Sequence, residues 1–232
     1  MEVRNMDLRA SQAAVLVVLL REAGVDPSWL LAYVSDPRAK RRAAAAVGVP
    51  VDVWKTVMYA VLMGARVPAP DRARRSRGEV VGAIREAVGP TEFAATYRRF
   101  LDHTAGLRAA LAEWHRWLVD VYVPGNAVRN NADGKRYLTN EVGAKVAVED
   151  LAAGGRGWQL RARLAAFLLQ GREAALVHTL AASSGRYGFR VLSHEHDGLV
   201  VAGGVPPEAV EAAAAAARLP LDLVALEAKP FL

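Results

Sequence analysis

The segment at residues 190–201, RVLSHEHDGLVV, constrains the fold of this chain more than any other stretch. Residues 191–193 and 199–201 are of types that favour β-strands, and Gly198 stands near the point where the chain must turn. The segment therefore predicts a β-hairpin, around which the other elements have to be arranged.

Four ionisable side chains crowd the bend of this hairpin: His194, Glu195, His196 and Asp197. Because side chains alternate along a strand, the two histidines are expected on one side and the two carboxylates on the other. One interpretation is an ordinary polar turn. The other is a carboxylate presented to a divalent metal at a strand end, which requires a second carboxylate from elsewhere in the chain.

The composition is that of a folded protein. The chain has 232 residues, 53% hydrophobic and 23% charged, which suits one large domain or a core with a large insertion. The absence of cysteine excludes disulfides and thiolate zinc sites and favours an intracellular, cytoplasmic location. The apolar run at residues 13–20 is too short to cross a bilayer, so neither a membrane partner nor a signal peptide is expected.

A second acidic residue with a suitable placement occurs near the start of the chain. Residues 2–8 are expected to form a short strand that ends near Asp7, and residues 10–22 a buried or half-buried helix. Asp7 is either the second metal carboxylate or a cap that accepts backbone N–H bonds of that helix.

Positive charge is concentrated in two places, and the net charge of +6 suits either a polyanionic partner or a solvated surface. A helix that begins near Pro37 carries the first group: Arg38, Lys40, Arg41 and Arg42. The connector at residues 66–78, expected to be an exposed loop or a frayed helix, carries the second: Arg66, Arg72, Arg74, Arg75 and Arg77. Each group is open to two interpretations, a solvated face or contacts with phosphates.

The segment at residues 50–64, PVDVWKTVMYAVLMG, predicts a helix that ends at Gly64. Lys55 and Tyr59 are four residues apart and therefore lie on one face. An ammonium group and an aromatic ring on one face suit the phosphate and the sugar or base of a nucleotide, although ordinary helix surfaces show the same spacing.

The remaining elements follow from turn and helix signals. They are helices at residues 28–34, 79–88, 91–117, 158–183 and 206–218, strands at 118–123 and 221–227, and a hairpin around Asp133-Gly134. The aromatic residues of helix 91–117 are assigned to the core, and Gly171 indicates a close approach by another segment. Strands at both ends of the chain are expected to pair in one antiparallel sheet with helices on one face, which would bring Asp7 and Asp197 together.

Three motifs in this order resemble the palm and fingers of the family A DNA polymerases and the related single-subunit phage RNA polymerases. The first is MDLRASQAAVL, with Asp7 at the end of a strand. The second is the helix KTVMYAVLMG with Lys55 and Tyr59, and the third is the pair His196-Asp197 in SHEHDGLVV. A helix that contains Gln170-Gly171 precedes the third motif, as it does in that family.

The chain departs from the family pattern at several positions. Val51 stands where the family has an arginine four residues before the motif lysine, so Arg41 or an adjacent arginine is expected to substitute. Met63 replaces a tyrosine, and Gly198 stands where Glu or Ser usually follows the His-Asp pair. Gln12 takes the place of a glutamate that disfavours ribose in the DNA polymerases of the family.

The resemblance implies an α+β fold, with a small antiparallel palm-like sheet packed with helices and a helical fingers-like insertion. Residues 1–12 and 118–232 would form the palm-like catalytic core, and residues 13–117 the fingers-like region. We expect a short form without exonuclease and thumb regions, to which an accessory protein chain supplies a thumb.

The resemblance also implies template-directed nucleotidyl transfer, as in DNA replication, with a nucleic-acid primer–template and a nucleoside triphosphate as partners. Asp7 and Asp197 would hold two Mg²⁺ or Mn²⁺ ions, and His196 would orient the primer end. The nucleotide-binding residues would be Lys55, Tyr59, Gln12, Arg41 and Gly64. The residues in contact with primer or template would be Gln170, Arg74 and Arg75.

Two other functions stay open on the sequence. The chain is a non-catalytic basic nucleic-acid-binding module or a degenerate polymerase subunit if its carboxylates do no chemistry. A metal-dependent hydrolase would use His194 and His196 as ligands. That function needs a third ligand, whereas His103, His115 and His178 lie on helices assigned to packing.

Overall fold

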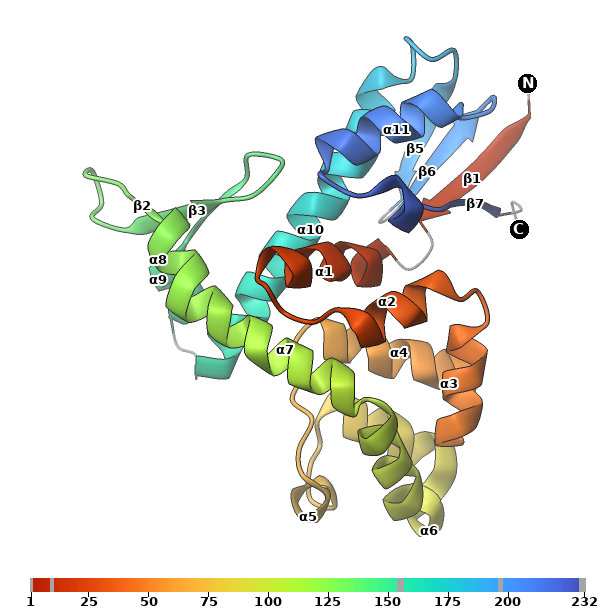
Figure 1. The fold of residues 1–232 in the computed structure, drawn as a ribbon, viewed down its shortest axis with the longest axis vertical. Coiled ribbons are helices and arrows are strands. Elements are labelled where there is room, and N and C mark those ends of the chain that lie inside the picture. The colour runs from red at the N-terminus through yellow and green to blue at the C-terminus, as the bar shows by residue number, and fades with distance from the viewer. Residues whose placement is uncertain (1, 9–10, 154–156, 196–197, 230–232) are drawn as a thin grey trace. The chain divides into compact units, whose positions relative to one another are not determined.

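The structure is a computed structural model that describes residues 2–8, 11–153, 157–195 and 198–229 (Figure 1). The first elements are β1 Val3–Leu8, α1 Ser11–Glu22, α2 Ser28–Ser35, α3 Ala39–Val47, α4 Val51–Leu62, α5 Pro70–Ala73, α6 Glu79–His103, α7 Ala105–Trp117, a π-helical turn Leu118–Tyr122 and α8 Val123–Asn126. They are followed by β2 Val128–Arg129, β3 Arg136–Thr139, β4 Lys145–Ala147, α9 Val148–Ala152, α10 Gly157–Ser183, β5 Arg190–Glu195, β6 Gly198–Ala202, α11 Pro207–Ala216, a 3₁₀ turn Leu221–Leu223 and β7 Leu226–Lys229.

The chain divides into two compact units. The first unit comprises Met1–Leu19, Val128–Ala147 and Phe167–Leu232, and it holds the strands of both sheets. The second unit comprises Leu20–Ala127 and Val148–Ala166, and its regular elements are helices. The predicted α+β fold is therefore confirmed.

The larger sheet of the first unit has the strand order β5-β6-β1-β7 and is antiparallel throughout. The predicted hairpin is confirmed as β5 and β6, and β1 pairs with β7 near the other end of the chain, as expected. Every residue of β6 is buried. The strand β6 is therefore the more buried of the two central strands, and β1 is hydrogen-bonded on both of its edges.

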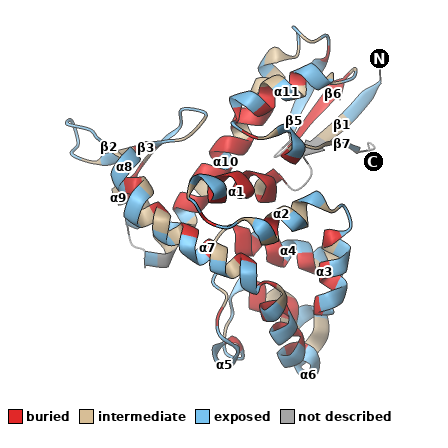
Figure 2. Ribbon diagram, viewed as in Figure 1, coloured by how far each residue is buried: buried red, intermediate tan, exposed pale blue. Residues whose placement is uncertain are grey.

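The helix α10 covers one face of this sheet. Its residues Val177 and Leu180 share a small apolar cavity with Met6, Leu199 and Leu226, which come from three neighbouring strands. The helix α1 is buried along almost its whole length, as predicted (Figure 2). Burial of these apolar faces holds the sheet in place, because it removes apolar surface from water.

Residues 118–123 are predicted as a strand, and this prediction is wrong. The chain instead continues α7 as a π-helical turn, with helical backbone angles at Trp117 and Leu118. Leu118 and Trp114 are fully buried and four residues apart, so a helix places both on one packed face. This packing overrides the β preference of the valines in the segment.

The strand predicted at residues 221–227 is shorter and begins later than expected. Leu221–Leu223 forms a 3₁₀ turn after Pro220, and the strand β7 begins only at Leu226. Leu223 is buried and lies with Ala14 of α1 around a small cavity. The turn is thus stabilised by the burial of one apolar side chain that an extended strand would have placed elsewhere.

The long helical stretch that begins with α6 has one expected interruption and one unexpected one. At Gly89 the backbone leaves the helical region, with φ 74° and ψ 171°, as the Gly-Pro pair predicts. A second break, at Thr104, lies inside the predicted helix 91–117. There the Thr104 hydroxyl donates to the Phe100 carbonyl at 2.7 Å, and Arg108 donates to a second carbonyl of the same turn at 2.8 Å. These bonds satisfy groups that a helix end leaves free.

Aromatic side chains form the core of the second unit. The Trp54 indole N–H donates to the Tyr33 hydroxyl at 3.1 Å, and the Trp54 ring lies 6.3 Å from Phe100 and 5.6 Å from His103. Phe100 and Tyr97 are buried, which confirms their assignment to the core. The helices α2, α4 and α6 are therefore held together by one aromatic cluster.

The smaller sheet has the order β2-β3-β4, and the hairpin predicted around Asp133-Gly134 joins β2 to β3. The Tyr137 hydroxyl donates to an Asp133 carboxylate oxygen at 2.7 Å. This bond, followed by that from the Lys135 backbone N–H, lowers the pKa of Asp133. The turn is thus stabilised by its own side chains.

Over the described residues, no single helix combines the length and apolar composition needed to cross a membrane. The helices α3 and α4 meet these criteria only when they are counted together, and they are bent by 98° relative to each other.

Candidate active site

Asp7 lies in the strand β1, which pairs with β6 on one side and with β7 on the other. Its partners across the two ladders are Gly198 and Glu227. Gly198 is in turn the partner of Glu195 in β5. One row of the sheet therefore runs Glu195, Gly198, Asp7 and Glu227, with Asp7 on a central strand.

Gly198 directly follows the predicted catalytic pair His196-Asp197, which lies outside the described residues. The described backbone thus pairs Asp7 with the residue next to Asp197 in the sequence. The two acidic segments, although 190 positions apart, belong to neighbouring strands. The register defines the pairing of Asp7 with Gly198, whereas the placement of Asp197 beside Asp7 stays a prediction.

A second histidine lies beside His194 of β5. The ring of His178 from α10 is 6.2 Å from that of His194, and both side chains are exposed. The helix α10 packs on the sheet, as predicted, but the His178 side chain lies on its solvent-facing side and does not take part in that packing. Among the side chains that the structure describes, no group of three or more His, Cys, Asp or Glu is arranged to hold a metal ion.

The His103 ring contacts the aromatic cluster and the His115 ring lies 5.5 Å from the buried Trp114 ring, as expected for helices assigned to packing. Burial, together with the nearby charge of Arg161, lowers the pKa of His115 to about 4. The ring of His103 lies against Trp54, and partial burial lowers its pKa as well. Both rings are therefore neutral at pH 7 and serve packing.

The helix α4 presents Lys55 and Tyr59 to solvent on one face. Tyr59 is 52% exposed, so its ring is available to a ligand and does not belong to the core. The opposite face is packed, with Trp54, Val57 and Val61 buried. The amphipathic pattern of the sequence thus decides which side of α4 can meet a ligand.

Gly64, just after α4, has a structural reason to be glycine. Its φ of +82° is one that other residues rarely adopt, and an added Cβ would lie 2.9 Å from the Cβ of Ala162 on α10. Gly64 therefore lets the end of α4 approach α10 within the second unit.

The arginines of α3 differ in their partners. Arg42 forms an ion pair with Asp36, whereas Arg41 is exposed and has no ion pair among the described side chains. Of these two residues, Arg41 is the one that can offer its charge to a ligand without breaking a bond. Gln12, the other predicted contact to the nucleotide, is half-buried on α1 in the first unit.

Gln170 is exposed on α10, and the close approach predicted at its neighbour Gly171 is confirmed. An added Cβ at Gly171 would lie 2.6 Å from the side chain of Asn140, which follows β3. The next residue, Arg172, donates to a Glu141 carboxylate oxygen at 2.8 Å and is only 3% exposed. The sequence identified the glycine, but it gave no sign that Asn140 and Glu141 were its neighbours.

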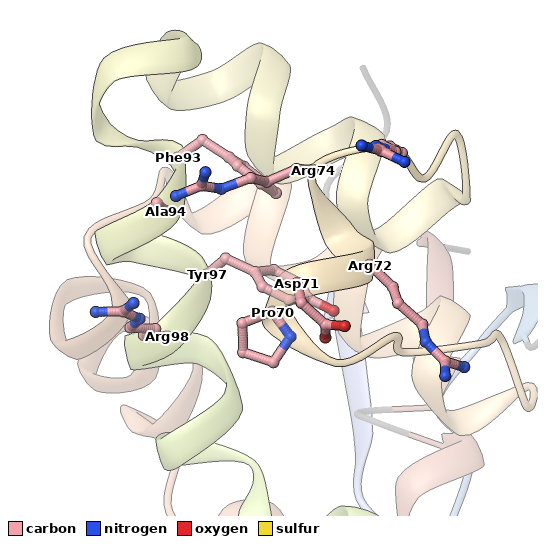
Figure 3. A pocket seen from close by; sticks show the side chains of 9 residues that line it. Pro70, Asp71, Arg72, Arg74, Phe93, Ala94, Tyr97 and Arg98 are labelled. Carbon is pink, nitrogen blue, oxygen red and sulfur yellow. The ribbon is translucent and has the colours of Figure 1, made fainter.

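Arg74 and Arg75 are exposed at the end of α5 and line a pocket in the second unit (Figure 3). Arg72 and Arg98 line the same pocket. Sequence reasoning did not select Arg98, because a single arginine on a helix surface carries no signal of its own.

No protein-family model matches the sequence, and no curated protein matches it either. Among solved structures, the chain is similar to the POL domain of Pol1 from M. smegmatis, in a complex with DNA primer-template and dNTP. The TM-score is 0.54 and the sequence identity 16%. The similarity covers 98% of this chain and 39% of that one, so the chain spans less than half of the similar structure. The chain therefore has a polymerase-like fold.

Proposed function

We propose that this chain is the palm-and-fingers core of a template-directed nucleic-acid polymerase, a nucleotidyltransferase that extends a primer with nucleoside triphosphates. The observation that carries the proposal is the pairing of Asp7 with Gly198 on the central strands of a polymerase-like fold. It makes the strand of Asp7 the neighbour of the hairpin that contains Asp197.

Asp7 and Asp197 hold Mg²⁺ or Mn²⁺ in this proposal. The donors fit these ions, because carboxylate oxygens are the hard ligands that both prefer. Metal ions held there would supply activation of the 3′-hydroxyl of the primer and stabilisation of the leaving pyrophosphate. His196, the sequence neighbour of Asp197, would orient the primer end.

The second unit supplies contacts to the nucleotide. Lys55 neutralises the charge that builds on the phosphates as the bond breaks, where a fixed cation is most effective. Tyr59 contacts the sugar, and Arg41 substitutes for the family arginine at whose position Val51 stands. Gln12, which belongs to the first unit, is proposed as a further contact to the sugar. The exposure of Lys55, Tyr59 and Arg41 supports these roles, since none has to leave a packed core to reach a ligand.

Primer and template contact Gln170, Arg74 and Arg75, all of them exposed. The division into a palm-like core of residues 1–12 and 118–232 and a fingers-like region of residues 13–117 stays a prediction, as does the thumb from an accessory chain. Contacts to the nucleic-acid backbone should make binding salt-dependent.

The experiment is extension of a labelled primer–template with Mg²⁺ or Mn²⁺, with deoxynucleotides and ribonucleotides tested separately. The Asp7→Ala and Asp197→Ala variants should both lose extension. The matched control is Glu211→Ala, which removes an exposed carboxylate from α11 of the same unit and should leave extension unchanged.

Extension that survives loss of either aspartate would overturn the metal assignment. Absence of extension in the unaltered chain, with salt-sensitive nucleic-acid binding that is equal in all variants, would instead identify a non-catalytic binding module or a degenerate subunit.

A further inference from the structure

A pocket of about 810 Å³ lies in the second unit, between the segment that contains α5 and the helix α6 (Figure 3). Its charged and aromatic lining side chains are Asp71, Arg72, Arg74, Arg75, Phe93, Tyr97 and Arg98. The volume is within the range of pockets that enclose a small ligand, roughly 300–1,000 Å³. The pocket is therefore large enough to hold more than an isolated ion.

The lining is strongly positive. Four arginines face one aspartate, a formal excess of three positive charges. Within the described part of the chain, none of these five side chains has an ion pair or a side-chain hydrogen bond. Like charges gathered in a concave surface repel one another, and an anion that enters relieves this repulsion.

Arg85 fixes the segment that carries three of these arginines. Its guanidinium donates to the carbonyl oxygens of Ala73 at 2.8 Å, Ser76 at 3.2 Å and Arg74 at 3.3 Å. The same group lies 4.7 Å from the centre of the Phe93 ring. The backbone around Arg74 and Arg75 is therefore held against α6 before any ligand binds.

The other end of the segment is fixed by Tyr97. Its hydroxyl donates to the Pro68 carbonyl at 2.7 Å, and burial raises the pKa of Tyr97 to about 12. Phe93 and Tyr97 are only 5% and 1% exposed. Their rings thus form the floor of the pocket and offer no free face on which a base could stack.

We propose that this pocket binds the phosphate backbone of single-stranded nucleic acid, which in the proposed polymerase is the unpaired template strand. Figure 3 shows the guanidinium groups of Arg72, Arg74 and Arg98 spread around the pocket, and this spread suits phosphates spaced along a strand. Because the aromatic floor is covered, recognition is by charge and is independent of base sequence.

A single strand fits this pocket better than a duplex does. Duplex DNA carries its phosphates on a stiff, convex surface, and bending even a short site costs free energy, so a duplex enters a hollow less readily. A single strand can follow the concave surface. The pocket proposal rests on the polymerase proposal only where it identifies the bound strand as the template. Its test measures binding alone and requires neither a metal ion nor a reaction.

The test is fluorescence anisotropy of a labelled oligothymidine with the full chain, in EDTA, over a range of salt concentrations. The double variant Arg74→Gln/Arg98→Gln removes two charges from the pocket. Arg66→Gln/Arg77→Gln is the matched control, because both arginines are exposed on the same connector and neither lines the pocket. Circular dichroism checks that both variants are folded.

Loss of one exposed charge pair weakens binding about 5-fold, so the pocket variant, which loses two, should bind about 25-fold more weakly at low salt. The control variant should change the affinity less than about 2-fold. The slope of log K against log salt should fall by about 1.4, or about 0.7 for each lost phosphate contact. Unlabelled single strand, which follows the spread of the arginines, should compete for the site better than duplex DNA or tripolyphosphate at equal phosphate concentration.

Equal weakening in both variants, or in neither, would overturn the pocket assignment. If duplex DNA or tripolyphosphate competed more strongly than unlabelled single strand, the single-strand assignment would be overturned. Primer extension, measured separately, distinguishes the two proposals. The pocket variants leave Asp7 and Asp197 intact. A chain without polymerase activity can still show binding of single strands that depends on the pocket.

Discussion

Gly171 of α10 lies against the side chain of Asn140 so closely that an added Cβ would be 2.6 Å from it. A glycine inside a helix normally costs stability, and replacement by alanine gains about 1 kcal/mol. At Gly171 the close contact makes replacement by alanine destabilising. The added Cβ would press on the Cβ of Asn140, and the backbone of one of the two segments would have to shift to make room. The glycine allows the segment after β3 to pack directly on α10.

We expect Gly171→Ala to reduce the free energy of unfolding by about 1–3 kcal/mol, as overpacking does. Urea denaturation measures this change. Gly82→Ala on α6 is the matched control, since nothing lies within 4 Å of its added Cβ, and it should stabilise the protein. A gain of stability in both variants would show that the contact at Gly171 is absent in solution.

His115 should make stability depend on pH. Its pKa is about 4 in the folded chain against 6.5 for an unperturbed histidine, because burial disfavours the charged ring. The unfolded ring therefore binds a proton as the pH falls below 6.5, while the folded ring stays neutral until about 4. Stability that is present above pH 6.5 is lost across this window, by about 2 kcal/mol between pH 7.5 and pH 5.

Denaturation of His115→Leu at the same two pH values should show a smaller loss, because the neutral side chain has nothing to protonate. The exposed His178→Leu should keep the pH dependence of the unaltered protein. The same loss in His115→Leu as in the unaltered protein would contradict the assignment.

Arg85 should affect the arginine-lined pocket without being part of its lining. Arg85→Lys keeps the charge but loses the three-carbonyl contact, so we expect lower stability, by about 1–3 kcal/mol, and weaker single-strand binding. Arg99→Lys is the control, because Arg99 donates to the Val47 carbonyl elsewhere in the same unit. Arg99→Lys should lower stability and leave single-strand binding unchanged. Unchanged single-strand binding in Arg85→Lys would show that the segment does not need this support.

Lys55 should matter for catalysis and not for folding. It is exposed, so Lys55→Ala should change the free energy of unfolding by less than about 0.5 kcal/mol. If Lys55 stabilises charge in the transition state, kcat/KM for nucleotide addition should fall about 100-fold. Thr56→Ala, on the exposed side of the same helix, should leave kcat/KM unchanged. Equal kinetics in Lys55→Ala and Thr56→Ala would remove α4 from the nucleotide site.

Local signals in the sequence were sufficient to predict those elements for which the residue pattern and the tertiary packing favour the same structure. The β5–β6 hairpin has strand-forming residues on both sides of a turn, and α4 has one apolar and one polar face. The break at Gly89 follows from the Gly-Pro pair, because proline cannot continue a helix without losing a hydrogen bond. In each case the short-range preference and the long-range fold favour the same structure.

The sequence-based predictions were wrong where burial, or a side-chain hydrogen bond to a residue four positions away, outweighs the intrinsic preference of the segment. Residues 118–122 are rich in β-branched valine, yet Leu118 packs with Trp114 on one helical face. The break at Thr104 depends on a hydroxyl that bonds back to Phe100, a conformation that threonine takes only in some settings. Propensities of a fraction of a kcal/mol are smaller than the free energy of burying one large side chain.

The sequence by itself determined the order of the motifs, the side of α4 that faces solvent, and the α+β class, because periodicity and turn chemistry act over a few residues. Only the tertiary structure decided that Asp7 pairs with Gly198, that Asn140 meets Gly171, and that Arg98 joins Arg72 and Arg74 around one pocket. These relationships depend on strand register and helix packing between segments far apart in the chain, which no local pattern encodes.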